Sequence, residues 1–274
     1  MFLGIDIGGT TINMGLVENG RVVERKSGPS FLPGDSLQQT LDKLASLIES
    51  IFVPEVESIG IGVPSVVDTK RGIVYDAANI PSWKEVHLKE ELEKRFKVPV
   101  SVNNDANCYA LGATSQISGD ADSIKVAVTL GTGVGIGVVI GSRILNGRNT
   151  GVGELSALPY GKSIIEDICS RKYFDAMGLV PAEVGARAKS GDRQALDTFA
   201  QFGENLAQLV NVVLLAYDPD CIVFGGGIAN NSEFFHEPML KKLAELFPYS
   251  ESLKTLEFDY KPQSEYAIIG ASML

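Results

Sequence analysis

An acidic residue at the junction of a strand and a helix is the first candidate for chemistry in this sequence. The apolar run from Val98 to Val102 predicts a strand and a helical pattern starts near Ala106, so Asp105 stands between the two. A carboxylate at that place could accept the proton of a substrate hydroxyl as a general base. Asp and Asn are also preferred helix N-caps, and the spacing alone favours a cap. Glycine-rich turns elsewhere in the sequence shift that balance toward the base.

Two of these turns have the composition of phosphate-binding loops. Gly8-Gly9-Thr10-Thr11 follows Asp6 and joins two apolar strands, and Gly131-Thr132-Gly133 joins two more. Glycines let a backbone come close to a phosphate, and the threonines add hydroxyl donors. Either turn alone is as well explained by an ordinary hairpin. Two in one chain indicate two similarly built lobes, each aiming a turn at one ligand.

A third glycine turn, Gly225-Gly226-Gly227, lies between an apolar strand and a helix that starts at Ser232. Such a turn can accept a nucleotide, although it can equally serve helix packing. The polar, glycine-rich stretch from Asn146 to Glu154 is, on its composition, a surface connection.

Composition limits the function classes. The chain has 274 residues, with 24 Lys and Arg against 34 Asp and Glu and a net charge of -10. An acidic protein without a basic run is expected to bind neither nucleic acid nor an anionic membrane surface. We find no signal peptide and no apolar run near the ~18 residues that a membrane span needs. The three cysteines are far apart in the sequence, as is typical of proteins whose thiols stay reduced, so a cytoplasmic protein is expected.

The patterns in the rest of the sequence predict alternating strands and helices. The helical period covers residues 37–52, 88–96 and 194–217, and a second half begins near residue 113. Residues 267–274 are expected to form a strand, a turn and a short helix. This order predicts an α/β protein with mixed sheets and helices packed on them.

The motifs together resemble the ROK family of sugar kinases, within the actin/hexokinase/Hsp70 ATPase superfamily. The resemblance implies two α/β lobes around a cleft, each with a mixed sheet: a smaller lobe of residues 1–112 plus 263–274, and a larger one of residues 113–262. The motifs that carry it, in order, are Asp6-x-Gly8-Gly9-Thr10, Gly62-Val63-Pro64, Asn79-Ile80-Pro81-x-Trp83, Asn104-Asp105-Ala106-Asn107, Leu130-Gly131-Thr132-Gly133, Gly151-x-Gly153-Glu154 and Gly225-Gly226-Gly227.

By this resemblance the protein binds ATP, with Mg²⁺ bridging the phosphates. The residues implied for the nucleotide are Asp6, Gly8, Gly9, Thr10, Thr11, Gly131, Thr132 and Gly133 at the phosphates and Gly226 and Gly227 at the adenosine.

The resemblance also implies that Asp105 deprotonates a sugar hydroxyl, normally the 6-hydroxyl, as that oxygen attacks the γ-phosphorus. The residues implied to hold the other hydroxyls are Ser65, Asn79, Asn104, Glu154 and Glu166. Phosphoryl transfer needs this combination of positioning, charge neutralisation and a carboxylate at the nucleophile. Without the resemblance, Glu154 and Glu166 would be interpreted as surface acids.

The sequence departs from the family at one place. The family usually has a His, three residues after the Gly-Glu motif, that binds both sugar and zinc, followed by a cysteine cluster; here that position is Ala157, and residues 158–165 contain no cysteine. Tetrahedral zinc needs about four ligands, and none gather in this segment. We therefore expect no zinc, and the missing histidine leaves the sugar preference open.

A glucokinase that works as a homodimer is the leading interpretation. Kinases of N-acetylhexosamine, fructose, allose or glucosides, and a polyphosphate-using glucokinase, are the alternatives. A sugar-sensing repressor would need a helix-turn-helix segment ahead of the motif at Asp6, and we expect no such segment because the motif starts at residue 6. A non-catalytic sugar-binding protein is disfavoured by Asp105 and both glycine hairpins.

Overall fold

The computed structural model describes residues 1–77, 79–249 and 251–274. Contacts divide the chain into two compact units. Residues 142–152 lie in the first unit, whereas the boundary drawn from the sequence placed them in the second lobe. The first unit comprises Met1–Ser118, Ser142–Val152 and Ser264–Leu274, and the second comprises Gly119–Gly141 and Gly153–Gln263.

The first unit is built on a mixed sheet with the strand order β3-β2-β1-β4-β8. The antiparallel hairpins β1–β2 and β2–β3 lie on one side, and β4 and β8 run parallel to β1 on the other. Asn19 and Gly20, which join β2 to β3, have φ values of 51° and 73°, as expected of an Asn-Gly hairpin turn. The strands are β1 (Phe2–Ile7), β2 (Thr11–Glu18), β3 (Arg21–Pro29), β4 (Ser58–Val63) and β8 (Val100–Asn104).

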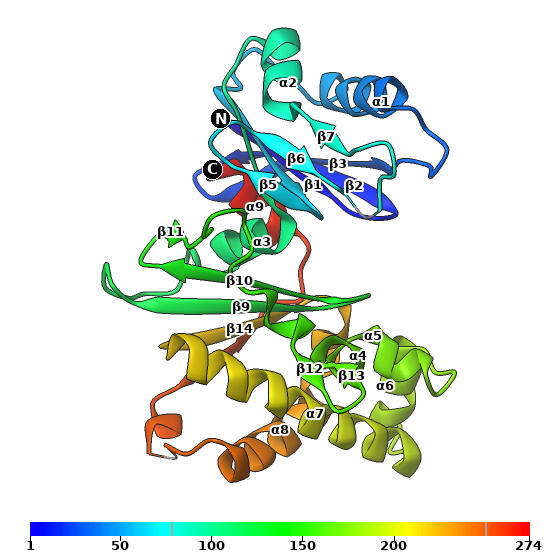
Figure 1. Ribbon diagram of the computed structural model, residues 1–274, viewed down its shortest axis with the longest axis vertical. Coiled ribbons are helices and arrows are strands. Elements are labelled where there is room, and N and C mark those ends of the chain that lie inside the picture. The colour runs from blue at the N-terminus through cyan, green and yellow to red at the C-terminus, as the bar shows by residue number, and fades with distance from the viewer. Residues whose placement is uncertain (78, 250) are drawn as a thin grey trace. The chain divides into compact units, whose positions relative to one another are not determined.

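Helices cover both faces of this sheet (Figure 1). Helix α1 (Leu37–Glu49) and α2 (Leu88–Phe96) lie on one side, and α3 (Asp105–Thr114) and α9 (Glu265–Ser272) lie together on the other. Glycines allow α3 and α9 to touch backbone to backbone, since a Cβ at Gly112 would stand 1.9 Å from the carbonyl oxygen of Tyr266. The expected strand-turn-helix fragment at the C-terminus is wrong, because this close packing holds the segment as a helix.

Shorter strands complete the first unit. A small antiparallel sheet joins β5 (Val66–Asp68), β6 (Ile73–Tyr75) and β7 (Glu85–Val86), and β11 (Arg143–Ile144) lies in the 142–152 segment. The hydroxyl of Thr150 accepts a hydrogen bond from the N–H of Val67 at 3.1 Å, which ties that segment to the small sheet.

The second unit repeats the plan of the first. Strands β9 (Ile124–Leu130) and β10 (Val134–Ile140) form an antiparallel hairpin, and β14 (Cys221–Gly225) and β15 (Glu257–Tyr260) extend the sheet in parallel from β9. The order β10-β9-β14-β15 matches β2-β1-β4-β8 of the first unit. The sheets confirm the predicted mixed α/β fold and the repetition of strand, glycine turn and strand.

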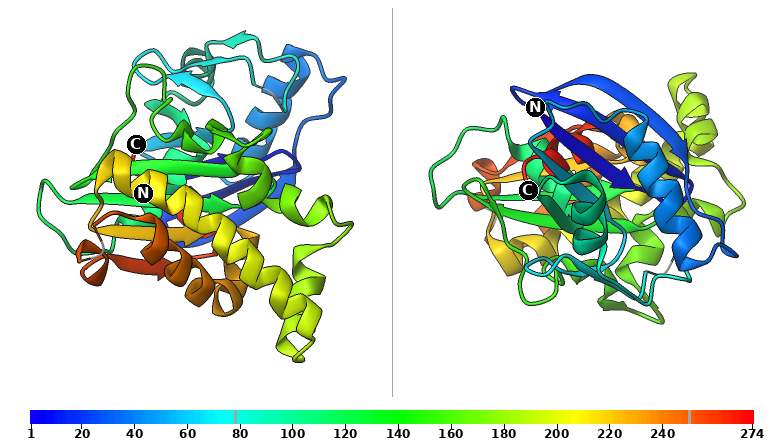
Figure 2. Two further views of the ribbon diagram at one scale, coloured as in Figure 1. Left: turned by 60° about the horizontal axis from the view of Figure 1, so that its bottom comes forward. Right: turned by 90° about the horizontal axis from the view of Figure 1, so that it is seen from above.

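Helices α7 and α8 lie side by side in the second unit (Figure 2). The amphipathic pattern of α7 buries Phe199 and Phe202 against Phe174 and Phe235, and Asp218 ends the helix in the left-handed conformation. The helices and short strands of the second unit outside its main sheet are η1 (Glu154–Ala157), β12 (Pro159–Tyr160), β13 (Ser163–Ile164), α4 (Ile165–Cys169), α5 (Arg171–Asp175), α6 (Pro181–Lys189), α7 (Arg193–Tyr217), η2 (Gly227–Asn231), α8 (Ser232–Leu246) and η3 (Ser252–Lys254).

Candidate functional site

The N-terminus of α3 carries the candidate base. The side chain of Asn104 caps this helix, because its Oδ1 accepts hydrogen bonds from the N–H groups of Ala106 at 2.9 Å and Asn107 at 3.2 Å. Asp105 is the first residue inside the helix, so the N-cap role that spacing alone suggested for it belongs to Asn104. The Asp105 carboxylate lies at the positive end of the helix dipole.

Asp105 and Asp6 lie at the same edge of the first sheet. Asp6 at the end of β1 pairs in register with Gly62 on β4, and Gly62 pairs with Asn103 on β8, two residues before Asp105. Both carboxylates also act on the thiol of Cys108, whose pKa is raised well above its usual value first by burial and then by the charges of Asp6 and Asp105. The first sheet therefore brings together the Asp of the glycine turn and the candidate base.

Asp6 is held in a polar network behind the turn. Burial raises the pKa of Asp6 to about 6, although a hydrogen bond with Asn13 and the charge of Arg25 act in the opposite direction. Arg25 Nη2 donates to Asn13 Oδ1 at 3.4 Å and to Ser264 Oγ, beside α9, at 2.9 Å. Burial therefore makes Asp6 take up its proton at a higher pH than an exposed aspartate does.

The three sugar-binding candidates of the first unit lie close to this edge. Asn104 Nδ2 donates to the carbonyl oxygen of Ser65 at 3.4 Å, and the Ser65 hydroxyl donates to the carbonyl oxygen of Tyr75 at 2.5 Å. A Cβ at Gly9 would lie 3.7 Å from Nδ2 of Asn79, whose side chain is exposed. Within the first unit, the structure gathers short polar groups beside the Gly8–Thr11 turn and Asp105.

The two glycine turns of the second unit also lie together. Strands β9 and β14 are parallel neighbours, and Thr129 pairs with Gly225, so the turns that follow them leave the same edge of the sheet. Gly226 has a φ of 80°, and a Cβ there would stand 2.4 Å from the carbonyl oxygen of Leu130. Around Gly131 and Gly227 a Cβ would meet no atom within 4 Å. This open, backbone-lined edge can admit a nucleotide.

Glu154 and Glu166 are neighbours in the second unit. Gly153, with a φ of 99°, lies against the carbonyl oxygen of Ile136 and donates its N–H to the Tyr217 hydroxyl at 3.1 Å, which fixes the start of η1 at Glu154. Partial loss of solvation and then the charge of Glu166 raise the pKa of Glu154. Tyr217 is a supporting residue that the sequence pattern did not indicate.

Glu166 lies on the glycine turn itself. Its Oε2 accepts a hydrogen bond from the N–H of Val134 at 3.1 Å, and a Cβ at Gly133 would stand 2.7 Å from that oxygen. Its Oε1 lies 2.7 Å from Nζ of Lys172, a residue that the sequence analysis missed. The structure therefore joins a candidate sugar-binding carboxylate to a candidate phosphate-binding turn.

Ala157 ends η1 and is exposed. Among the residues that the structure describes, no group of three or more His, Cys, Asp or Glu side chains is placed to hold a metal ion. Cys108, Cys169 and Cys221 are all buried and unpaired as disulfides.

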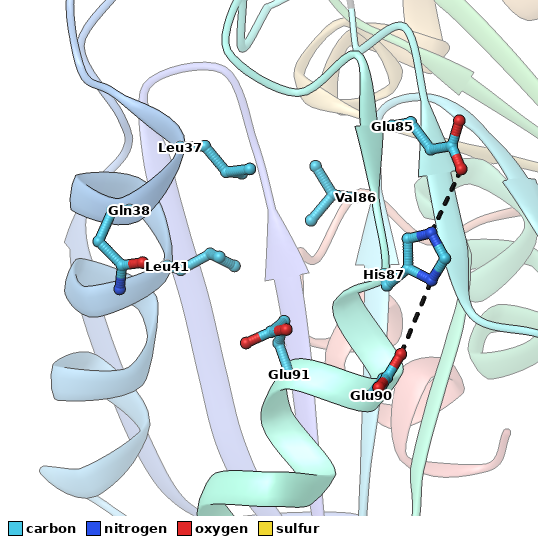
Figure 3. Close-up of a pocket in the computed structure, with 8 residues that line it drawn as sticks. All are labelled: Leu37, Gln38, Leu41, Glu85, Val86, His87, Glu90 and Glu91. Atoms are coloured by element: carbon cyan, nitrogen blue, oxygen red, sulfur yellow. Dashed lines mark hydrogen bonds and ion pairs between the residues drawn. The ribbon is translucent and has the colours of Figure 1, made fainter.

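A separate groove of about 450 Å³ lies in the first unit, between α1 and the β7–α2 segment (Figure 3). Its wall includes His87, whose Nε2 lies 3.2 Å from Oε1 of Glu85 and whose Nδ1 lies 3.7 Å from Oε2 of Glu90. None of the candidate site residues lines it. The lining residues are Leu37, Gln38, Leu41, Glu85, Val86, His87, Glu90 and Glu91.

Two repeated α/β units that each carry a glycine turn and carboxylates are typical of a kinase-type phosphotransferase. Residues 2–274 match the ROK family, and the chain belongs to that family. It is 29% identical to a glucokinase of Thermotoga maritima, over 99% of this chain and 96% of the relative. It is also 29% identical to an N-acetyl-D-glucosamine kinase of Escherichia coli, over 84% of this chain and 85% of the relative.

The fold has a solved counterpart in the ROK family glucokinase of Streptomyces griseus, determined in complex with glucose and AMPPNP. That structure matches with a TM-score of 0.80 at 24% identity, over 99% of this chain and 98% of the other. The chain is a sugar kinase with the actin-like ATPase fold. No helix among the described residues is long and apolar enough to cross a membrane.

Proposed function

We propose that this sugar kinase transfers the γ-phosphoryl group of ATP to a hexose, with glucose as the favoured substrate and its 6-hydroxyl as the acceptor. The observation that carries the proposal is the place of Asp105, at the N-terminus of α3 and on the same sheet edge as Asp6 and its glycine turn. The glucokinase relative supports glucose.

Asp105 is the proposed general base. It accepts the proton of the attacking hydroxyl, so that the oxygen becomes a better nucleophile as its bond to phosphorus forms. The cap made by Asn104 fixes the backbone at Asp105, and the helix N-terminus favours the ionised carboxylate that a base requires. The other hydroxyls are held by Ser65, Asn79, Asn104, Glu154 and Glu166, which offer short polar or carboxylate groups to a polyol.

The glycine turns are the proposed nucleotide site. Open space at Gly131 and Gly227 fits a ligand that approaches the backbone closely, and the Thr10, Thr11 and Thr132 side chains add hydroxyl donors. Mg²⁺ is proposed to neutralise the phosphate charge, as it does when carried by a nucleotide. We further propose, on the family resemblance, a cytoplasmic homodimer that does not bind nucleic acid.

A second candidate substrate is an N-acetylated hexosamine. The E. coli relative supports it at the same identity as the glucokinase. Ala157 supports it as well, because a methyl group demands no hydroxyl at that place of the site.

The experiment is a coupled assay of the purified protein with a panel of sugars, each offered with ATP and with polyphosphate. The panel contains glucose, N-acetylglucosamine, N-acetylmannosamine, fructose, allose and a methyl glucoside. The proposal expects the highest kcat/KM for glucose with ATP. Higher values for an N-acetylhexosamine would transfer the assignment to that sugar, and phosphorylation of no sugar with either donor would refute the proposal.

A further inference from the structure

A lysine bridges two adjacent carboxylates next to the glycine turn of the second unit. Lys172, on α5, places its Nζ 2.7 Å from Glu166 Oε1 and 3.1 Å from Asp167 Oδ1. Both carboxylates raise the pKa of Lys172, so the side chain is an ammonium ion. Since α4 and α5 are separate short helices, this bridge joins the two elements.

The other members of the bridge are anchored. Asp167 Oδ2 accepts hydrogen bonds from the Ser163 hydroxyl and from the N–H of Ile164, the latter at 3.4 Å. The backbone of α5 is tied to the glycine turn, because the N–H of Arg171 donates to the carbonyl oxygen of Gly131 at 2.9 Å. Lys172 therefore projects from a fixed backbone toward a fixed partner.

Glu166 is held from two sides. Its Oε1 accepts a hydrogen bond from the ammonium group of Lys172, and its Oε2 accepts one from the N–H of Val134, just beyond the turn. Two fixed donors set the rotation of a carboxylate, and charge-assisted hydrogen bonds are among the stronger ones. Each carboxylate oxygen has a second lone pair, so Glu166 can still accept hydrogen bonds from substrate hydroxyls.

We infer that Lys172 is a positioning residue that holds the Glu166 carboxylate against the Gly131–Thr132–Gly133 turn in the orientation that binds the sugar. The inference rests on the proposed function, in which Glu166 accepts sugar hydroxyls. Lys172 itself need not touch the sugar. An exposed ion pair adds little to stability, whereas a carboxylate free to rotate loses affinity for an oriented ligand. The effect of Lys172 therefore falls on sugar binding and not on folding.

The test compares Lys172→Met, Lys172→Arg and a control, Lys242→Met. Lys242 makes an exposed 2.8 Å ion pair with Glu245 on α8, in the same unit and outside the candidate site. The readouts are kcat, KM for ATP and KM for the best sugar of the wild-type panel. Sugar binding without nucleotide is measured by calorimetry.

We expect Lys172→Met to raise the KM and the calorimetric Kd for sugar by about 10- to 100-fold, with kcat, the KM for ATP and Tm near the wild-type values. Lys172→Arg, which keeps the charge, recovers most of the lost sugar affinity. Lys242→Met leaves kcat, both KM values and the Kd for sugar at the wild-type values. In a Glu166→Gln background, Lys172→Met raises the KM and Kd for sugar by less than about threefold more, because the two residues act as one unit.

Two results would overturn the inference while the proposed function stands. One is an active wild type in which Lys172→Met behaves as Lys242→Met does. The other is a loss in Lys172→Met that Lys172→Arg does not recover and that persists undiminished with Glu166→Gln. A wild type that phosphorylates no sugar would instead overturn the proposed function, and the inference with it.

Discussion

Gly62 lies directly against Asp105. A Cβ at Gly62 would stand 3.3 Å from the Cα of Asp105 and 3.2 Å from the Sγ of Cys108. Such distances are tight for a real side chain, so the absence of a side chain on β4 sets how closely the first turn of α3 approaches the sheet. The position of the candidate base therefore depends on a residue that carries no reactive group.

Replacing Gly62 with Ala is expected to lower kcat about tenfold, because the first turn of α3 must move by a few tenths of an ångström and misplaced reacting groups slow the chemical step. The KM for ATP should change little. Steady-state kinetics and thermal unfolding of the same preparation check this. Gly34→Ala is the matched control, since a Cβ there meets no atom within 4 Å and its φ is not positive. Equal kcat values for the two variants would show that Gly62 does not set the position of Asp105.

Asp6 gives a prediction about stability and pH. Burial raises the pKa of Asp6 from 3.8 to about 6, so the folded state holds the proton more tightly than the unfolded state does. The contribution of Asp6 to stability is full below pH 4 and is lost as pH rises through 6. Asp6→Asn should therefore be more stable than wild type at pH 8, by about 1 to 3 kcal/mol, with the difference vanishing near pH 4.

Denaturant unfolding at several pH values between 4 and 8 measures that difference. Asp122→Asn serves as the control, because Asp122 is exposed and lies in a surface turn. A pH-independent effect of Asp6→Asn would mean that the hydrogen bond to Asn13 and the charge of Arg25 cancel the effect of burial on the pKa of Asp6, and a variant less stable than wild type at pH 8 would mean that they outweigh it.

Ala157 leads to a prediction about selectivity. By the family resemblance, the histidine that Ala157 replaces reaches hydroxyls near C1 and C2 of the sugar, and a methyl group cannot hydrogen-bond them. A site indifferent to a hydroxyl discriminates by about 10² or less, against roughly 10⁴ to 10⁵ for a site built to pair it. We expect 2-deoxyglucose or 1-substituted glucose to be accepted within ~100-fold of glucose in kcat/KM. Competing-substrate kinetics decide this. Losses of more than ~10⁴-fold for all of these analogues would mean that another side chain pairs those hydroxyls.

Chelators should leave the fold unchanged. A structural metal contributes its binding free energy to folding, so its removal lowers Tm. We expect the same Tm in EDTA as in buffer when no nucleotide is present. A fall in Tm on EDTA treatment that added Zn²⁺ reverses would contradict the expectation that the chain holds no zinc.

The sheets could be predicted because the patterns that specify them are local. Alternating and continuous apolar runs bounded by glycine turns give β1–β2 and β9–β10, and the Asn19-Gly20 turn follows from the φ values that only a few residue types accept. Helix α9 could not be predicted, because its run of small and apolar residues has no helical period. Its helical conformation is fixed by contact with α3 through Gly112 and Gly270.

The finer geometry of the candidate site depends on contacts that no spacing reveals. Asn104 and Asp105 are both good N-caps, and only the extended backbone of Asn104, with ψ of 146°, assigns the cap to it. Lys172 lies six residues after Glu166, across the break between α4 and α5 at Ser170, so helical spacing gives no hint of their bridge.

The most direct test of Asp105 as the general base is the kinetics of Asp105→Asn. The substitution keeps the size of the side chain but removes its ability to accept a proton, so kcat should fall on the order of 10² to 10⁴, with sugar affinity nearly unchanged. Circular dichroism and calorimetric sugar binding establish that the variant is folded and binds. A folded Asp105→Asn variant with kcat within about threefold of wild type would contradict the assignment of Asp105 as the general base.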